Sequence, residues 1–299
     1  MTTSTNIVRN AQGARSPFRR ISWAWLGVAP FFIYIFLFLI YPSSKLVIGS
    51  FQDASGHFTF QNIFGLNNSE ILGSYLVSLR ISFFTALVGA VFGFLLAYSM
   101  SRGGLPMYVR TSLITFCGVA SNFAGIPLAF AFIATIGRTG MVTQFLNAIG
   151  LNPYNSGFDL YSFWGLSLAY IYFQFPLMAL IITPAIDGLR KEWREAAENV
   201  GCSSWDYWLR VALPILTPSI LGSTILLFGN AFGAYATAYA LTGGGMSLVT
   251  IRIGDQLSGD LGGLTPAMGY SMALGMLVIM SISVACYSIL QRQSERWLK

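Results

Sequence analysis

The chain has 299 residues, of which 55% are hydrophobic and 9% are charged. An ordinary soluble domain carries about 25% charged residues, so this composition excludes a soluble globular protein and indicates one that is mostly embedded in a membrane. The formal net charge of +6 comes from 17 Lys and Arg against 11 Asp and Glu. The placement of these residues relative to the apolar segments accounts for the charge without a nucleic-acid partner.

Six charge-free segments are long enough to cross a bilayer, which takes about 20 apolar residues. A polar tail at 1–22 precedes the first predicted span, 23–47. The other five spans lie in a core over 75–290, and a second polar tail follows at 291–299. The sequence therefore predicts an all-α protein with six transmembrane helices. The predicted helices of the core cover 78–101, 111–136, 161–184, 214–241 and 267–290.

The charge-free segment 139–158 is too polar for a membrane span, because it holds Gln144, three asparagines and a proline. Its apolar residues form one helical stripe that ends at Gly150, which predicts a short helix at the membrane surface. The charge-free run 211–251 is predicted to hold one helix of about 25 residues, because prolines stand near its start and consecutive glycines near its end.

Lys and Arg are distributed unequally between the loops. Loops rich in these residues favour the cytoplasmic side of the membrane. If the N-terminus is cytoplasmic, 13 of the 17 basic residues lie inside and only Lys45, Arg80, Arg138 and Arg252 lie outside. This distribution predicts that both termini and the loop between spans four and five are cytoplasmic.

The loop 187–211 is a polar island between the fourth and fifth spans. An apolar face at helical spacing predicts a first short helix, and Gly201 follows where a helix end favours a residue that tolerates positive φ. Ser203 and the aspartate three residues later have the spacing of a capping box, which predicts a second helix. Leu213-Pro214 is predicted to end that helix and to open the fifth span. The face of the first helix consists of Trp193, Ala196, Ala197 and Val200.

Two interpretations of this loop stay open on physical grounds alone. The helix pair either covers the inner end of the bundle at the membrane surface or docks on another protein. The small side chains of Ala196 and Ala197 favour docking, because they let a helix backbone approach another protein closely.

The same loop carries a motif. It consists of Glu195-Ala196-Ala197, three residues, Gly201, nine residues, and Val211-x-Leu213-Pro214. It resembles the EAA signature of permeases from binding-protein-dependent ABC importers, which usually have Ile where this chain has Val211. The resemblance covers about 75–290 and implies the type I permease fold, with the first span added in front. Within the family, the segments 34–42 and 78–82 most resemble the spermidine/putrescine group.

The resemblance implies that the chain works in a bacterial inner membrane with several partners. These are a homologous second permease subunit, two cytoplasmic ABC ATPase subunits and a periplasmic or extracellular solute-binding protein, with contact to membrane lipid and none to nucleic acid. The implied solute is a polyamine. Ferric iron and aminoethylphosphonate are alternatives that related members carry.

In this family the EAA loop docks in a cleft of the ATPase. Carried over to this chain, Glu195 meets basic groups of the ATPase, Ala196 and Ala197 pack in its cleft, and Gly201 makes the turn. The candidate coupling residues are therefore Trp193, Glu195, Ala196, Ala197, Val200, Gly201, Val211, Leu213 and Pro214.

The sequence contains no G-x-x-x-x-G-K-[ST] phosphate loop, so ATP hydrolysis is expected on separate subunits and the chain is not expected to be an enzyme. No catalytic residue and no cofactor is predicted. The scattered Cys117, Cys202 and Cys286 and the single His57 suggest neither a disulfide framework nor a metal site.

Few polar side chains lie within the predicted spans, and such groups usually face a bundle interior or a water-filled cavity. Hydrogen bonding between helices is the alternative role for each of them. Asn230 is favoured for the solute path because Tyr235 and Thr237 follow it in the same span, and aromatic rings can contact a cation. The full set of candidate path residues is Asn122, Gln174, Asn230, Tyr235 and Thr237.

The middle of every predicted span lacks Asp, Glu, Lys and Arg. This disfavours the alternative class of protein, an ATP-independent secondary transporter that moves protons through an intramembrane carboxylate relay. Gly89-x-x-x-Gly93 and Gly229-x-x-x-Gly233 predict close helix crossings.

Overall fold

The computed structural model describes residues 24–53, 55–258 and 266–297. These residues form helices, with one isolated antiparallel bridge between Gln52 and Phe58, which confirms the all-α prediction. The predicted tail at 1–22 lies outside the described residues. The helices are α1 (Ala24–Ile35), α2 (Tyr41–Ser50), α3 (Gln61–Phe64), α4 (Ser69–Arg102), α5 (Met107–Asn122), α6 (Ile126–Ile136), α7 (Met141–Ala148), α8 (Phe163–Asp187), α9 (Lys191–Asn199), α10 (Ser204–Tyr207), α11 (Leu213–Phe232), α12 (Ala236–Thr242), α13 (Val249–Ser258) and α14 (Pro266–Trp297).

The chain divides into two compact units, residues 1–45 and 46–299. The described part of the first unit is a helical stretch in which α1 continues through the π-helical turn Phe36–Ile40 into the first residues of α2. Its aromatic and aliphatic side chains are almost all exposed. A helix that is apolar on every face suits a lipid environment or a partner's membrane helix.

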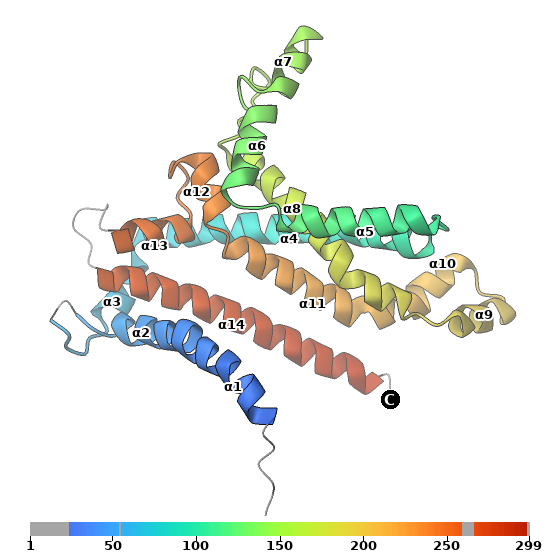
Figure 1. Cartoon of the computed structure of the whole chain (residues 1–299), viewed down its shortest axis with the longest axis horizontal. Helices are drawn as coiled ribbons and strands as arrows, with labels where there is room; N and C mark the ends of the chain where they lie inside the picture. The colour runs from blue at the N-terminus through green and yellow to red at the C-terminus, as the bar shows by residue number, and fades with distance from the viewer. Residues whose placement is uncertain (1–23, 54, 259–265, 298–299) are drawn as a thin grey trace, which may run out of the picture. The chain divides into compact units, whose positions relative to one another are not determined.

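Helix α8 forms the centre of the second unit, where it packs against α4, α5 and α11. Of its most apolar window, 61% is buried, the largest share among the six candidate spans. Figure 1 shows α4, α8 and α11 lying side by side. Helices α9 and α10 lie at one end of this unit, whereas α3 and α13 lie at the other end. The apolar composition of α8 on every face explains its central position.

Glycines bring α4 and α8 together. A Cβ atom on Gly89 would lie 2.9 Å from Cβ of Gln174, and one on Gly93 would collide with the side chain of Met178 and the carbonyl oxygen of Phe175. The close crossing predicted from Gly89-x-x-x-Gly93 is therefore confirmed. In the second motif, Gly229 is covered by Met280 of α14.

Six described segments are long and apolar enough to cross a membrane, as predicted. The third differs from the prediction, because it covers α6 and α7 instead of 111–136. Helix α7 is the short helix predicted in 139–158. The six segments are Gly27–Ser50, Ser69–Arg102, Ile126–Ala148, Phe163–Asp187, Ser204–Phe232 and Ala267–Ile289.

The prediction of one helix over 111–136 is wrong. Helix α5 ends at Asn122, α6 begins at Ile126, and Gly125 between them has a φ of 75°. Pro127 lies in the first turn of α6. Its ring lacks an N–H and would clash with a carbonyl of the preceding turn in a continuous helix, so the chain breaks before it.

The prediction of one helix over 214–241 is also wrong. Helix α11 ends at Phe232 and α12 begins at Ala236, with an irregular segment starting at Gly233. Glycine weakens a helix interior by about 1 kcal/mol relative to alanine, which favours a break at this position. At the C-terminal end of the chain, α14 continues to Trp297, beyond the predicted end at 290.

Candidate functional site

The loop between α8 and α11 folds as the predicted pair of short helices. Gly201 follows α9 with a φ of 80°. Its N–H donates to the carbonyl of Glu198 at 3.0 Å, and the N–H of Cys202 donates to the carbonyl of Ala197 at 3.0 Å. These two bonds form a Schellman motif, which satisfies helix-end carbonyls and requires a left-handed residue at this position.

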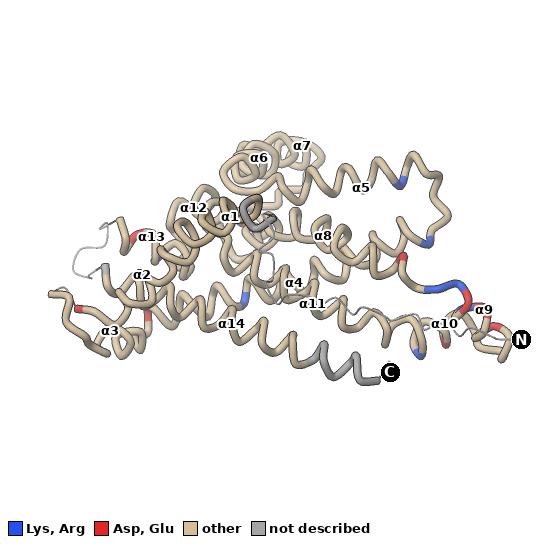
Figure 2. Tube along the Cα trace, turned by 60° about the horizontal axis from the view of Figure 1, so that its bottom comes forward, with Lys and Arg blue, Asp and Glu red and all other residues tan. Residues whose placement is uncertain are grey.

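Ser203 caps the second helix, α10. Its hydroxyl accepts from the N–H of Asp206 at 3.1 Å and donates to the Asp206 carboxylate at 2.6 Å. Figure 2 shows the charged residues around α9 and α10 and at the neighbouring helix ends. The capping prediction is confirmed.

The predicted end of α10 at Leu213-Pro214 is wrong. A π-helical turn, Trp208–Ala212, joins α10 to α11, so helix runs without interruption from Ser204 to Phe232. Pro214 lies in the first turn of α11 and cannot donate a backbone hydrogen bond. The wider π turn changes the bonding register just before the proline, which allows the helix to pass through it.

Part of the predicted docking face of α9 is buried within the chain, and the rest is exposed. Ala197 is buried and packs in the core cluster with Leu189 and Tyr207, and Trp193 packs partly against the same cluster. Ala197 is therefore not available to enter a partner's cleft, in contrast to the expectation from the motif. Ala196 is exposed, and Val200 is 78% exposed.

The remaining candidate coupling residues occupy different surroundings. Glu195 is exposed on α9. Val211 packs partly against the core within the π turn. Leu213 and Pro214 are exposed at the start of α11. Of the candidate residues on α9 and its C-cap, Glu195, Ala196 and Val200 are thus exposed, beside the ion pair in which Arg194 Nε lies 2.8 Å from the Glu198 carboxylate. Hydrogen bonding to Glu198 raises the pKa of Arg194.

The structure brings three of the five candidate path residues together. Asn230, Tyr235 and Thr237 line one cavity of about 380 Å³. Ser121, Gly125 and Phe173 line it too, and the sequence analysis did not identify them. Gly125 was missed because it contributes backbone groups to the lining, and a search for polar side chains within the spans does not detect a glycine.

The two helix breaks meet at this cavity. The backbone N–H of Gly125, in the break between α5 and α6, donates to Oγ1 of Thr237 at 2.7 Å, just after the break between α11 and α12. Non-helical backbone inside a membrane protein is tolerated where protein buries it or where it lines a water-filled cavity. The cavity therefore combines polar side chains with backbone groups that are free of regular helical bonding.

The other two candidate path residues lie elsewhere. Gln174 is fully buried, and its Nε2 donates to Oγ1 of Thr85 on α4 at 2.7 Å. It takes the alternative role of interhelical hydrogen bonding. The side chain of Asn122 donates to the carbonyl of Gly118 in its own helix at 2.9 Å and does not line the cavity.

Comparisons with known proteins agree with this architecture. The family described as "Binding-protein-dependent transport system inner membrane component" matches residues 89–299. A bacterial ABC transporter involved in the import of alginate has a similar fold, with a TM-score of 0.70 and 17% identity, over 90% of this chain and 95% of that one.

Three relatives of this chain are named for the transport of different solutes. A probable sulfate transport permease from Anthoceros angustus is 28% identical over 56% of this chain and 55% of that protein. The thiamine permease ThiP of Escherichia coli is 26% identical over 58% of this chain and 31% of that protein. A putative ferric permease of Haemophilus influenzae is 25% identical over 84% of this chain and 38% of that protein.

These relatives are named for sulfate, thiamine and ferric transport, so they do not support the polyamine assignment. The family match itself covers well over half of the chain. The chain, a multi-pass helical protein with six candidate spans, therefore belongs to the family of inner-membrane components of binding-protein-dependent transport systems, the permeases of ABC importers.

Proposed function

We propose that this permease forms half of a path for a small solute that carries a tetrahedral oxyanion, and that α9 is its docking site for an ABC ATPase. The observation that carries the proposal is the cavity at the two helix breaks. It is open to the surface of the chain and offers hydroxyl and amide groups on an otherwise apolar helical protein, where a polar solute that crosses the membrane needs them.

The chemistry of the cavity favours an anion over a cation. Asn230 and Tyr235 supply N–H and O–H donors, the Ser121 hydroxyl donates to the carbonyl of Gly118, and the described lining residues include no carboxylate. Gly125 also places the N-terminus of α6 at the cavity. The N–H of Gly125 is bonded to Thr237 and Pro127 has none, so this end contributes the partial positive charge of the helix. A polyamine or ferric ion would find no opposite charge there.

Aminoethylphosphonate, one of the solutes implied by the sequence resemblance, carries a tetrahedral oxyanion, as does sulfate. The names of the sulfate-transport relatives support the same class. Their identity to this chain is 28% or lower, so the cavity and not the names carries the assignment.

The docking proposal depends on α9. Its exposed surface joins Glu195 to the small Ala196, beside a turn held by Gly201. Small side chains permit close approach to a cleft, and a carboxylate suits a basic partner surface. The excess of basic residues around this loop supports a cytoplasmic position for α9 and both termini. A second permease subunit and an external solute-binding protein complete the proposed importer.

The test is ATP hydrolysis by the complete importer in lipid vesicles, with the solute-binding protein present. Sulfate, phosphate and aminoethylphosphonate are compared with spermidine, thiamine and ferric citrate. We expect at least one oxyanion to stimulate hydrolysis, and spermidine, thiamine and ferric citrate to leave it at the basal rate. Stimulation by spermidine, thiamine or ferric citrate alone would refute the oxyanion assignment, and failure of the permease to co-purify with any ATPase would refute the docking role.

A further inference from the structure

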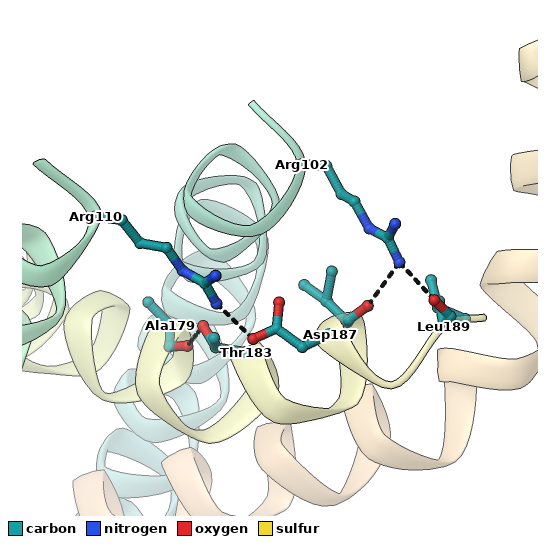
Figure 3. Close-up of polar contacts among 7 residues, drawn as sticks. Arg102, Arg110, Ala179, Thr183, Asp187 and Leu189 are labelled. Carbon is teal, nitrogen blue, oxygen red and sulfur yellow. Dashed lines mark hydrogen bonds and ion pairs between the residues drawn. The ribbon is translucent and has the colours of Figure 1, made fainter. Parts of the chain in front are cut away.

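Two arginines at the turn between α4 and α5 bind the end of α8 (Figure 3). Arg102, the last residue of α4, donates from Nη2 to the carbonyl oxygens of Ile186 at 3.2 Å and Leu189 at 2.8 Å. Arg110, in the first turns of α5, places Nη2 at 2.5 Å from the carboxylate of Asp187. The contacts span 77 to 87 residues of sequence.

The position of these contacts makes them more than surface ion pairs. The last carbonyls of a helix have no partner within the helix, and the helix C-terminus carries partial negative charge. Ile186 belongs to the last turn of α8, whereas Leu189 lies just before α9 and is buried. Arg102 therefore holds the backbone at the junction between α8 and α9, that is, at the end of α8 and in the linker that precedes α9.

Helix α5 connects this junction to the cavity. It carries Arg110 near its start and ends at Asn122, immediately before the break whose Gly125 lines the cavity. Twelve residues of helix separate Arg110 from Asn122, a rise of about 18 Å. A displacement of the junction that is transmitted through the arginines reaches the cavity along α5 as well as along α11.

We propose that Arg102 and Arg110 are positioning residues that transmit movement of α9 to α4 and α5, and through α5 to the cavity. The inference rests on the proposed docking of the ATPase on α9. It adds a second mechanical connection, made by side chains of the α4–α5 turn, to the direct connection through the backbone of α10 and α11. Neither arginine belongs to the EAA motif.

A purely structural role predicts a different result from a coupling role. If the arginines only stabilise the fold, their loss lowers the amount of assembled importer, and ATP hydrolysis and transport fall in proportion. If they transmit movement, the assembled importer still hydrolyses ATP, but fewer solute molecules cross for each ATP. The ratio of transport to ATP hydrolysis therefore separates the two roles.

The experiment measures that ratio for the complete importer in lipid vesicles, normalised to the co-purified ATPase. For Arg102→Gln we expect a fall on the order of tenfold, because a charged donor bonded to two partly buried carbonyls is lost. For Arg110→Gln we expect about a two- to fivefold fall, because its ion pair is more exposed. Basal hydrolysis and co-purification should stay at the wild-type level in both variants.

Two further variants sharpen the test. The reversed pair Arg110→Asp with Asp187→Arg should recover most of the loss seen in Arg110→Gln. Arg138→Gln is the matched control, because Arg138 stacks over Tyr154 and makes no bond to the α8–α9 junction. It should keep the wild-type ratio.

An unchanged ratio in an assembled Arg102→Gln importer would overturn the inference, and so would transport that falls only in proportion to hydrolysis. If the importer with Arg102→Gln does not assemble, the other two variants decide. An unchanged ratio of transport to ATP hydrolysis in Arg110→Gln refutes the transmission role. Failure of the reversed pair to recover that ratio refutes it too. A wild-type importer without solute-stimulated hydrolysis would overturn the proposed function and this inference together, whereas a stimulated wild type with unaffected variants overturns the inference alone.

Discussion

Substitution of Gly93 by alanine should destabilise the helix bundle more than the same change elsewhere in α4. The added methyl group would collide with the carbonyl oxygen of Phe175 and with the side chain of Met178. A backbone carbonyl in the middle of α8 cannot rotate away, so the two helices must move apart. Overpacking of this kind costs about 1–3 kcal/mol.

The same helix provides graded controls. Gly73 has open space where a Cβ atom would lie, so Gly73→Ala should be neutral or stabilising by about 0.5–1 kcal/mol, because alanine is the better helix former. Gly89→Ala is intermediate: its Cβ would lie 2.9 Å from Gln174 Cβ, which is fixed to the backbone, and 3.3 Å from Leu227 Cδ2, which can shift, but it would not meet a backbone carbonyl oxygen as Gly93→Ala does.

The measurement is the free energy of unfolding of the purified permease in micelles, by titration with a denaturing detergent. The expected order of stability is Gly73→Ala, then Gly89→Ala, then Gly93→Ala. The first and last variants should differ by about 1–4 kcal/mol. Equal stability of all three would refute the close packing of α4 on α8.

Three further predictions concern the docking segment and the cavity. Ala196→Trp should prevent co-purification of the ATPase while the permease stays folded. Ala197→Trp should instead destabilise the permease by about 1–3 kcal/mol, because Ala197 is buried within the chain. If Ala196→Trp destabilised the permease and Ala197→Trp only blocked the ATPase, the assignment of Ala196 to the exposed side of α9 and of Ala197 to the buried side would be refuted. Gly201→Pro should leave the protein inserted but abolish solute-stimulated hydrolysis, since proline cannot adopt the φ of 80° found there, and unchanged stimulation would contradict this. Asn230→Leu should alter the transport rate in vesicles, whereas Asn122→Leu should not; equal effects would exclude Asn230 from the path.

The features that the sequence predicted well are those set by neighbouring residues. Gly201 at the end of α9 and Ser203 at the start of α10 act through bonds to residues three to five positions away. The close packing at Gly89 and Gly93 was also predictable, because small residues four apart face the same side of a helix. Such local rules need no knowledge of the tertiary structure.

The features that were missed depend on contacts between distant segments. Ala197 is buried in a cluster that also holds Leu189 and Tyr207, from the segments before and after α9, and helical spacing alone does not reveal that cluster. The break at Gly125 was hidden because apolar residues continue on both sides, and its N–H is satisfied by Thr237, 112 residues away. Arg102 looked like an ordinary positive charge at a span end, since its carbonyl acceptors lie 84 and 87 residues away, at the end of α8 and in the linker that follows it.

The π turn before Pro214 has a geometric consequence. Because it keeps the chain helical, backbone hydrogen bonding continues for 29 residues from Ser204 to Phe232, with a bend where α10 meets α11 (Figure 1). The α11 part has 20 residues and a length of about 30 Å. A rotation of about 10° around its Leu213 end moves the far end, where Gly229 and Asn230 line the cavity, by roughly 5 Å. A modest swing of α11 is thus large enough, by leverage alone, to change the width of the cavity.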